Sequence, residues 1–444
     1  MQNNLITKKA NHIRDVIRYL QKFKNAVVVI YIDDKTIDSP LFSTHIQDIA
    51  LLHEAGLKVV LIPGARKRID EVLRSSNIEW SFHENTRVTR LEAIPLIKMA
   101  AFDVSNVVMT LLAAHNITAI IGNWVRARSK GIINGFDFGN AGEIDKLQVS
   151  AITKLLDDGF IPIFPCIGWS SSGHPYNISS SQLAQQVAIA LHADKLFFLL
   201  ENQSIGSEFF KIPSDFSLSE NNTVPAMDLY EVQEFLDLNK NSESPVLPFL
   251  SLAKDACEKG VTRVHLVDAS VNGVLPCEIF SDLGSGTMIY TNNYGKIRSM
   301  TQVDIPSVLS VMKPFIESGK LLPRSEQDLA GDMNDYIVYE LDGGVHACSA
   351  LKLYDENKGL KQAEIAGVAV DENFGHMGIG PKMMNYLLNK AKAQNVSSVF
   401  ILTTQAADWF ESLGFVPDSI ESLPEERKKV WSLKRNSKLY RLNF

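Results

Sequence analysis

Short runs of apolar residues alternate with longer stretches of helical period along the first two thirds of the chain. The run Ala26–Ile32 is rich in Val and Ile, a pattern typical of a strand that is buried on both faces of a parallel sheet. A stretch of helical period follows and ends at Gly56, and a second apolar run from Leu57 ends at Pro63 and Gly64. Strand, helix and strand in this order predict a crossover unit with two parallel strands.

The same alternation continues to about residue 290. Further strand-like runs occur at Ile117–Ile121, Ile161–Phe164, Lys195–Leu200 and Arg263–Val267. One clear helical stretch occurs at Ser180–His192. Together with a helix expected around Ile13–Phe23, they predict one layered α/β domain with a mainly parallel sheet. The segment Phe209–Pro248 is polar and contains Pro and Ser, so we expect an insertion or mobile excursion there rather than a third domain.

A polar, turn-rich segment, Tyr290–Lys296, separates this region from a new helical pattern at Val303–Glu317. The chain has 444 residues, more than one hydrophobic core normally supports. The sequence therefore predicts two domains, at residues 1–290 and 296–444.

The second domain contains an apolar strand, Ile365–Val370, followed by a glycine-rich turn and a helical pattern. The turn carries Gly375, Gly378 and Gly380 where the helix begins. Free backbone N–H groups and the positive end of a helix favour a pyrophosphate, and glycines let the backbone approach it. Coenzyme A contains such a pyrophosphate. Taken alone, the turn is equally consistent with a helix cap that binds no ligand.

Another strand, Val399–Leu402, and the aromatic helix sequence WFESLGF follow about twenty residues later. This order resembles that of the GNAT acetyltransferases, a mixed α/β fold whose turn holds acetyl-coenzyme A. The resemblance implies that acetyl-coenzyme A contacts Val368, Val370, Gly375, Gly378 and Gly380, and that no metal takes part. In the superfamily an Arg or Gln usually opens the turn, and here that position is Gly375, so we expect weaker cofactor affinity.

Nearly the whole chain resembles the bacterial two-domain N-acetylglutamate synthases, which begin arginine biosynthesis. The resemblance rests on the stretches IALLHEAGLKVVLIPGAR, NTRVT, SSQLAQQVAIALHADK, VTRVHLV, EIFSDLGSGT, AEIAGVAV, FILTTQAADWFESLGF and KRNSKLY. It implies transfer of an acetyl group from acetyl-coenzyme A to the α-amino group of L-glutamate.

Two residues match the catalytic positions of that family. Glu364, at the start of the cofactor strand, matches the general base that takes the proton of the amine. Thr403 matches the Ser or Thr that assists the thiolate leaving group. The structural alternatives are a solvated charge at a strand end for Glu364 and a β-favoured residue for Thr403.

Three cationic residues are candidates for holding the carboxylates of glutamate. Arg324 and Arg435 match arginine positions of the family, and the guanidinium fork suits a carboxylate. Lys438 is a third, weaker candidate, and each of these cations is otherwise a surface residue. Gly367 replaces a cysteine found in many relatives, which leaves the fit of the amine open.

The first domain resembles amino-acid kinases, but the residues that bind phosphate in those enzymes are replaced. Tyr31 stands in place of a lysine, and Asp33 and Asp34 stand in place of glycines. These changes predict a domain without kinase activity. The family uses this domain for regulation by arginine and for ring assembly. The resemblance implies an arginine site formed by Tyr19, Lys195, His265, Glu278 and Gly284. In this site Glu278 would face the guanidinium of the bound arginine.

The resemblance further implies a homo-oligomer, with a hexamer as one candidate, and leaves open whether arginine inhibits or activates. The alternative for His265 and Glu278 is a pair of structural polar residues at strand ends.

Composition and charge limit the other functions. Lys plus Arg number 44 against 51 Asp plus Glu, a net charge of −7, which argues against nucleic acid as a partner. The four cysteines lie far apart, the first residues lack a secretory pattern, and no uninterrupted run of 18 apolar residues occurs, so we expect a cytoplasmic protein. Two other functions remain open: acetylation of another amine, for which carboxylates would replace the arginines, and arginine sensing without catalysis.

Overall fold

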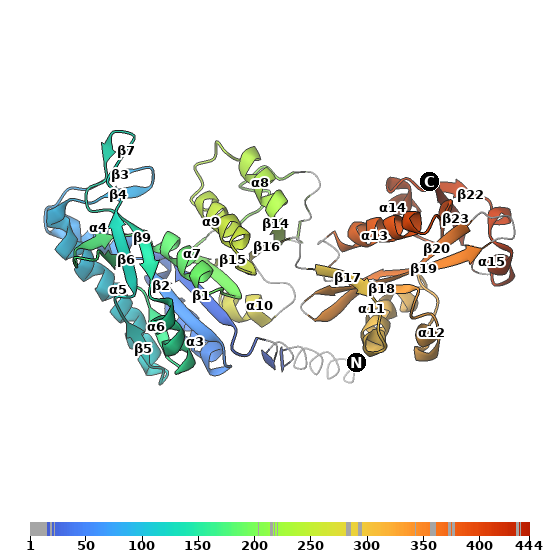
Figure 1. Cartoon of the computed structure of the whole chain (residues 1–444), viewed down its shortest axis with the longest axis horizontal. Helices are drawn as coiled ribbons and strands as arrows, with labels where there is room; N and C mark the ends of the chain where they lie inside the picture. The colour runs from blue at the N-terminus through green and yellow to red at the C-terminus, as the bar shows by residue number, and fades with distance from the viewer. Residues whose placement is uncertain are drawn as a thin grey trace. The chain divides into compact units, whose positions relative to one another are not determined.

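A computed structural model describes the chain in two compact units, Met1–Asn292 and Asn293–Phe444 (Figure 1). The structure describes all residues except 1–15, 18, 19, 22, 203, 214, 215, 217, 220, 281–285, 292–294, 342, 356–360, 372, 373, 375–377, 432–434 and 436. Most of the helix expected around Ile13–Phe23 therefore lies outside the described residues. The same is true of three predicted site residues, Tyr19, Gly284 and Gly375.

The first unit is built on an eight-stranded sheet with the order β14-β16-β15-β13-β1-β2-β10-β5. Its strands are β1 (Val27–Ile32), β2 (Lys58–Pro63), β5 (Ala119–Ile121), β10 (Ile161–Ile163), β13 (Lys195–Leu200), β14 (Ala226–Asp228), β15 (Arg263–Asp268) and β16 (Thr287–Tyr290). Neighbouring strands are parallel except β15 and β16. The predicted mainly parallel sheet is confirmed.

Helices cover both faces of this sheet, so β1 is buried on both sides (Figure 1). Val29 and Tyr31 face one hydrophobic core, whereas Val28, Ile30 and Ile32 face the other. This alternation explains the continuous apolar run in the sequence. The helices are α2 (Asp34–Ile37), α3 (Phe42–Glu54), α4 (Arg66–Ser75), α5 (Ile94–Ala114), α6 (Val149–Asp157), α7 (Ser180–Ala190), α8 (Leu229–Leu238), α9 (Leu247–Glu258) and α10 (Val274–Phe280).

A smaller sheet and two hairpins complete the first unit. The sheet has the order β12-β11-β6-β9, and the hairpins are β3–β4 and β7–β8. Their bounds are β3 (Ser81–His83), β4 (Thr86–Val88), β6 (Val125–Ser129), β7 (Ile132–Ile133), β8 (Phe136–Asp137), β9 (Gly142–Leu147), β11 (Ile167–Trp169) and β12 (Pro175–Asn177).

The segment Phe209–Pro248 is not a third domain, as expected, but it is built into the first unit rather than inserted as an excursion. Its strand β14 pairs in parallel with β16 and forms an edge of the main sheet. Helix α8 follows, and its residues Val232 and Phe235 belong to the hydrophobic core. The strand has only three residues with alternating burial, which is too short a pattern to be recognised in a polar sequence.

Among the residues that the structure describes, one helix is long and apolar enough to cross a membrane by length and composition, namely Leu91–Ala114, which includes α5. It contains Lys98 and Asp103, so no uninterrupted apolar run marks it in the sequence. Its residues Ile97, Ala101 and Val108 are buried in the two cores of the first unit. It is therefore a packed helix of the layered domain.

The second unit contains a seven-stranded sheet with the order β17-β18-β19-β20-β21-β23-β22. Its strands are β17 (Gly295–Ser299), β18 (Tyr336–Leu341), β19 (Gly344–Asp355), β20 (Lys361–Val370), β21 (Ser398–Thr403), β22 (Val416–Asp418) and β23 (Lys438–Asn443). All neighbouring strands are antiparallel except β20 and β21. Strand β20 begins at Lys361, so Glu364 lies inside the strand rather than at its start.

Helices α11 (Ile305–Glu317) and α12 (Glu326–Gly331) lie on one face of this sheet, and α13 (Ile379–Ala393) and α14 (Ala407–Ser412) lie on the other (Figure 1). A short helix, α15 (Glu425–Lys429), precedes the last strand. The predicted mixed α/β fold of this unit is confirmed.

Candidate active site

The two parallel strands of the second unit separate at the residues predicted to catalyse the reaction. Strands β20 and β21 pair only from Gln362 to Glu364, although both continue beyond this point and are fully described. Gly367 has a left-handed φ of 61°, and the β19–β20 register shifts nearby. Backbone groups of β20 after Glu364 therefore lack a β21 partner and face the end of β21, where Thr403 lies. An extended ligand can pair with such an edge.

The carboxylate of Glu364 is buried and held by two side chains that the sequence did not reveal. Arg427 Nε donates to Glu364 Oε2 at 2.7 Å, and the Tyr354 hydroxyl donates to the same oxygen at 2.9 Å. Burial, followed by the charge of Glu364, raises the pKa of Tyr354. The solvated strand-end charge considered for Glu364 is thus not what the structure contains, since this residue is 6% exposed.

Thr403 and Lys438 lie opposite each other where β21 pairs with β23. The Thr403 hydroxyl accepts a hydrogen bond from the Ala406 backbone N–H at 3.0 Å, which stabilises the turn before α14. Its own proton remains available for donation, because a hydroxyl both donates and accepts. Lys438 is exposed.

Arg435 and Arg324 are connected through the loop that follows α11. Arg435 Nη2 donates to the carbonyl of Lys320 at 2.8 Å, and Arg324 lies four residues further along that loop. Burial and the nearby charge of Arg427 lower the pKa of Arg435. Arg324 makes a long contact with Asp332, at 3.4 Å. Arg435 therefore contacts the loop that carries Arg324 and lies close to Arg427, which contacts Glu364.

A buried hydroxyl also lies beside the bulge of β20. A Cβ atom at Gly367 would be 3.0 Å from the Tyr336 hydroxyl oxygen. This hydroxyl has no hydrogen-bond partner among the described residues, and burial raises the pKa of Tyr336 to about 12, although the charge of Arg324 opposes the shift.

The two described glycines of the glycine-rich turn have different roles. Gly378 precedes α13 with a φ of 62°, a conformation that favours glycine. Gly380 lies inside α13, where a Cβ atom would be 3.3 Å from the Trp409 ring. The first turn of α13 has no acidic residue, so its N-terminal end keeps its affinity for anions. Val370 lies beside Gly380.

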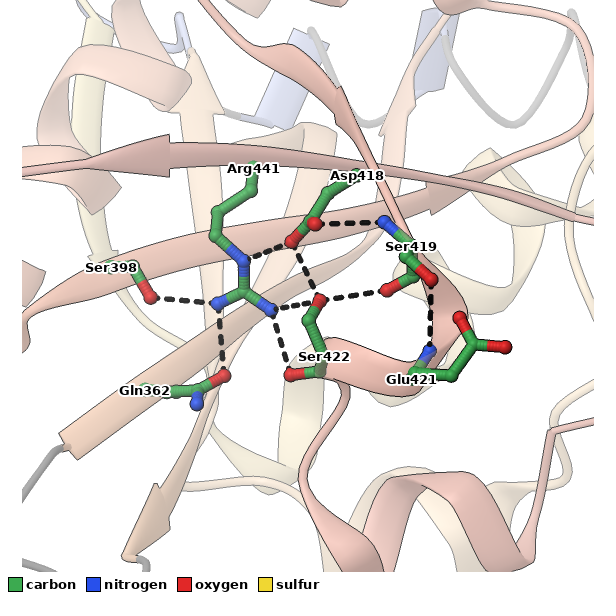
Figure 2. Close-up of polar contacts among 7 residues, drawn as sticks. All are labelled: Gln362, Ser398, Asp418, Ser419, Glu421, Ser422 and Arg441. Carbon is green, nitrogen blue, oxygen red and sulfur yellow. Dashed lines mark hydrogen bonds and ion pairs between the residues drawn. The ribbon is translucent and has the colours of Figure 1, made fainter.

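A buried arginine ties the strands together close to Glu364. Figure 2 shows Arg441, on β23, at the centre of this network. Its guanidinium donates to the Asp418 carboxylate, to Gln362 Oε1 at 2.9 Å, to Ser398 Oγ at 2.7 Å and to the Ser422 carbonyl at 3.0 Å. These partners belong to β22, β20, β21 and the turn after β22. The network fixes Gln362, two residues before Glu364.

In the first unit, a carboxylate occupies the N-terminal end of helix α4. Asp34 Oδ2 accepts a hydrogen bond from the Lys67 backbone N–H at 2.6 Å, in the first turn of α4. The Tyr31 hydroxyl donates to Asp33 Oδ1 at 3.2 Å. Burial and the charge of Asp34 raise the pKa of Asp33 to about 7.

Three of the residues predicted to bind arginine lie together on β13, β15 and α10. His265 Nδ1 lies 2.7 Å from Glu278 Oε1, and the Gly286 N–H donates to Glu278 Oε2 at 3.0 Å. Burial lowers the pKa of His265 to about 4. Burial also acts to raise the pKa of Glu278, but His265, Gly286 and Lys195 together lower it. The neutral imidazole therefore donates from Nδ1, and its buried Nε2 has no partner among the described residues.

Sequence reasoning missed Arg427, Tyr354 and Arg441. Arg441 left a signal, because it is a charged residue between the apolar residues Tyr440 and Leu442 of β23. Arg427 left none, since it lies in the charge-rich sequence PEERKK. Within the described residues, no cluster of three or more His, Cys, Asp or Glu side chains could hold a metal ion.

Comparisons with known proteins agree with this architecture. Residues 6–268 match the Amino acid kinase family, and residues 332–417 match the Acetyltransferase (GNAT) domain. The chain is 31% identical to the amino-acid acetyltransferase of Pasteurella multocida, covering 98% of this chain and 97% of the relative. It is 30% identical to that of Actinobacillus pleuropneumoniae, covering 99% of each.

Solved structures give the same result. The N-acetylglutamate synthase of Neisseria gonorrhoeae with coenzyme A and L-arginine has a TM-score of 0.78 at 27% identity, covering 98% of this chain and 99% of the other. The complex with coenzyme A and N-acetyl-glutamate has a TM-score of 0.60 at 29% identity, with the same coverage. The chain therefore belongs to the amino-acid acetyltransferase family, as an N-acetyltransferase with an amino-acid-kinase domain followed by a GNAT domain.

Proposed function

We propose that the chain transfers the acetyl group of acetyl-coenzyme A to the α-amino group of L-glutamate, as the first step of arginine biosynthesis. The observation that carries this proposal is the buried carboxylate of Glu364 beside the point where β20 and β21 separate, with cationic side chains around it. The N. gonorrhoeae synthase, crystallised with coenzyme A and with N-acetyl-glutamate, supports both the co-substrate and the product.

The reaction requires three events that these residues can support. Glu364 takes a proton from the substrate ammonium group, and the free amine attacks the carbonyl carbon of the thioester. The C–S bond then breaks, and the second proton, which the attacking nitrogen loses, reaches the sulfur from the side of Thr403. Val368 and Val370 offer backbone groups to the pantetheine chain, and Gly378 and Gly380 begin the helix that faces the pyrophosphate. Arg324, Arg435 and Lys438 supply positive charge for the carboxylates of the substrate.

Release of free thiol by the purified chain tests this function. We expect thiol release from acetyl-coenzyme A with L-glutamate, at a kcat/KM at least about ten times that with aspartate, glutamine or ornithine, since a polar site rejects acceptors that leave its groups unpaired. A preference for ornithine would indicate an acetyltransferase for another amine. Absence of thiol release with all four would favour arginine sensing without catalysis.

We also propose that the first unit is not a kinase. Asp34 already satisfies a backbone N–H at the start of α4, and the adjacent cavity is lined by the carboxylates of Asp34, Asp38, Glu71 and Asp103. The cations Lys67 and Arg68 at this cavity are paired with these carboxylates. We expect no ADP release from Mg-ATP in the presence of glutamate or N-acetylglutamate. ADP release that depends on either substrate would contradict the proposal.

The buried cluster of Lys195, His265 and Glu278 is proposed as part of an arginine site, with Tyr19 and Gly284 as further members outside the described residues. The carboxylate oxygens of Glu278 can each accept more than one hydrogen bond, and Nε2 of His265 has no partner among the described residues. A guanidinium supplies N–H donors for both acceptors. The synthase crystallised with L-arginine supports the choice of ligand. A homo-oligomer is part of this proposal, and sedimentation velocity gives its size.

Calorimetry checks this site. Glu278→Gln is expected to weaken arginine binding about 10-fold or more, because a charge-assisted hydrogen bond is lost. Glu258→Gln, at a half-exposed glutamate of α9 paired with Lys254, serves as the control and should bind arginine as the wild type does. In the wild type, arginine should also change the rate of thiol release, by binding two arrangements of the assembly with different affinity. Undiminished binding by Glu278→Gln would move the site elsewhere.

A further inference from the structure

Arg427 is the only described side chain that gives Glu364 an opposite charge by direct contact. The contact uses Nε alone, and no other hydrogen bond of this guanidinium occurs among the described residues. The side chain of Arg427 is 16% exposed, against 7% for Glu364. Its two terminal NH₂ groups, the fork that suits a carboxylate, therefore remain available for a ligand.

A second guanidinium, that of Arg435, lies close to Arg427. Arg435 is close enough for the charge of Arg427 to lower the pKa of Arg435, in addition to the effect of burial. Among the described residues Arg435 contacts only the neutral carbonyl of Lys320, so of these two guanidinium groups only Arg427 has a carboxylate partner, Glu364. Like charges at close range are costly unless an anion joins them. The cluster therefore favours one further carboxylate.

Packing holds Arg427 in place. The segment around α15 rests on a small hydrophobic cluster in which Leu423 and Trp431 contact Tyr354 and Phe400. Tyr354 also donates to Glu364, so the same cluster positions both partners of the ion pair. Arg427 is therefore a fixed guanidinium beside the base, rather than a mobile surface side chain.

We propose that Arg427 binds the α-carboxylate of the acceptor amino acid, and that the substrate replaces Glu364 as its partner. This inference rests on the proposed function. In the free enzyme Glu364 stands in for the substrate carboxylate, and arrival of the substrate releases Glu364 to accept the proton of the amine.

The geometry selects the α-carboxylate over the side-chain carboxylate. The amine must reach Glu364, and the α-carboxylate is attached to the same carbon atom as that amine. A guanidinium 2.7 Å from Glu364 is therefore within reach of the α-carboxylate, whereas the distal carboxylate extends towards the other cations. Exchange of partners leaves the carboxylate of Glu364 free to contact the ammonium group whose proton it accepts.

Three acceptors distinguish the role of the α-carboxylate from that of the side-chain carboxylate. Glutamate has both carboxylates. In isoglutamine the α-carboxylate is replaced by an amide, and in glutamine the side-chain carboxylate is replaced by an amide. For Arg427→Gln we expect the preference of kcat/KM for glutamate over isoglutamine to fall about 10- to 100-fold, the size of a charge-assisted hydrogen bond. The preference for glutamate over glutamine should change less than about 2-fold. Lys428→Gln, the next residue on α15, is the matched control and should keep both preferences.

A structural role for Arg427 gives a different result. If Arg427 only stabilises Glu364, its loss lowers kcat equally with all three acceptors and leaves both preferences unchanged, which overturns the proposal. If Arg427→Gln does not fold, Arg427→Lys keeps the charge without the planar fork and should lose part of the preference over isoglutamine; full retention also overturns it. A wild type that prefers another amino acid refutes the proposed function, and Arg427 is then tested with that acceptor and its α-amide.

Discussion

Replacing Glu364 by glutamine is expected to lower the turnover of acetyl transfer by about 100-fold or more, because loss of a general base typically has an effect of this size. The amide has nearly the same shape and still accepts hydrogen bonds from Arg427 and Tyr354, so the fold and the binding of coenzyme A should persist. Thiol release under saturating substrates measures the rate, and circular dichroism and coenzyme A titration measure the other two properties.

Glu326→Gln is the control for this substitution, because Glu326 is an exposed residue of α12. Its turnover should equal that of the wild type. An unchanged turnover for Glu364→Gln would show that Glu364 takes no part in the mechanism. If the variant loses both coenzyme A binding and turnover, Glu364 is a structural residue instead.

Replacing Arg441 by methionine is expected to reduce the free energy of unfolding of the second unit by about 2–3 kcal/mol. Methionine fills much of the space but leaves the partly exposed Asp418 without its cation, and it leaves Gln362 and the buried Ser398 without their donor (Figure 2). For a unit of this size, such a loss lowers the unfolding temperature by at least about 4 °C. Differential scanning calorimetry measures the shift, and catalysis should decline with it because Gln362 lies close to Glu364 in β20.

Lys313→Met provides the comparison in the same unit. Lys313 is exposed, and its pair with Glu317 has a separation of 3.9 Å, so the change should be below about 0.5 kcal/mol. Equal unfolding temperatures for Arg441→Met and the wild type would show that the network contributes nothing to stability.

The central strands could be predicted from the sequence because they are buried on both faces. Lys195–Leu200 has the predicted bounds, and the strand expected at Arg263–Val267 extends by one residue, to Asp268. Strand β14 could not be predicted in the same way. It acquires its position by pairing with β16, which is distant in the sequence, and pairing of this kind leaves no local period.

Some residues of the candidate site could likewise be predicted from the sequence, and others could not. Glu364 and Arg435 were accessible through the family resemblance, because they lie in matching stretches of sequence. The partner of Glu364 was not accessible, since Arg427 lies 63 residues away and only the fold brings the two side chains together. Sequence reasoning also treated Gly380 as an aid to phosphate approach, whereas in the structure its missing side chain admits the Trp409 ring.

On the proposal that the first unit binds no nucleotide, the carboxylate of Asp34 makes its folding independent of the nucleotide supply of the cell. A ligand that binds only the folded state stabilises it in proportion to the logarithm of the ligand concentration, so an enzyme that relies on bound phosphate to satisfy a helix end becomes less stable when that ligand is scarce. Here the anion is part of the polypeptide, and its local concentration never changes. The folded fraction of this unit should therefore stay constant as ATP levels rise and fall.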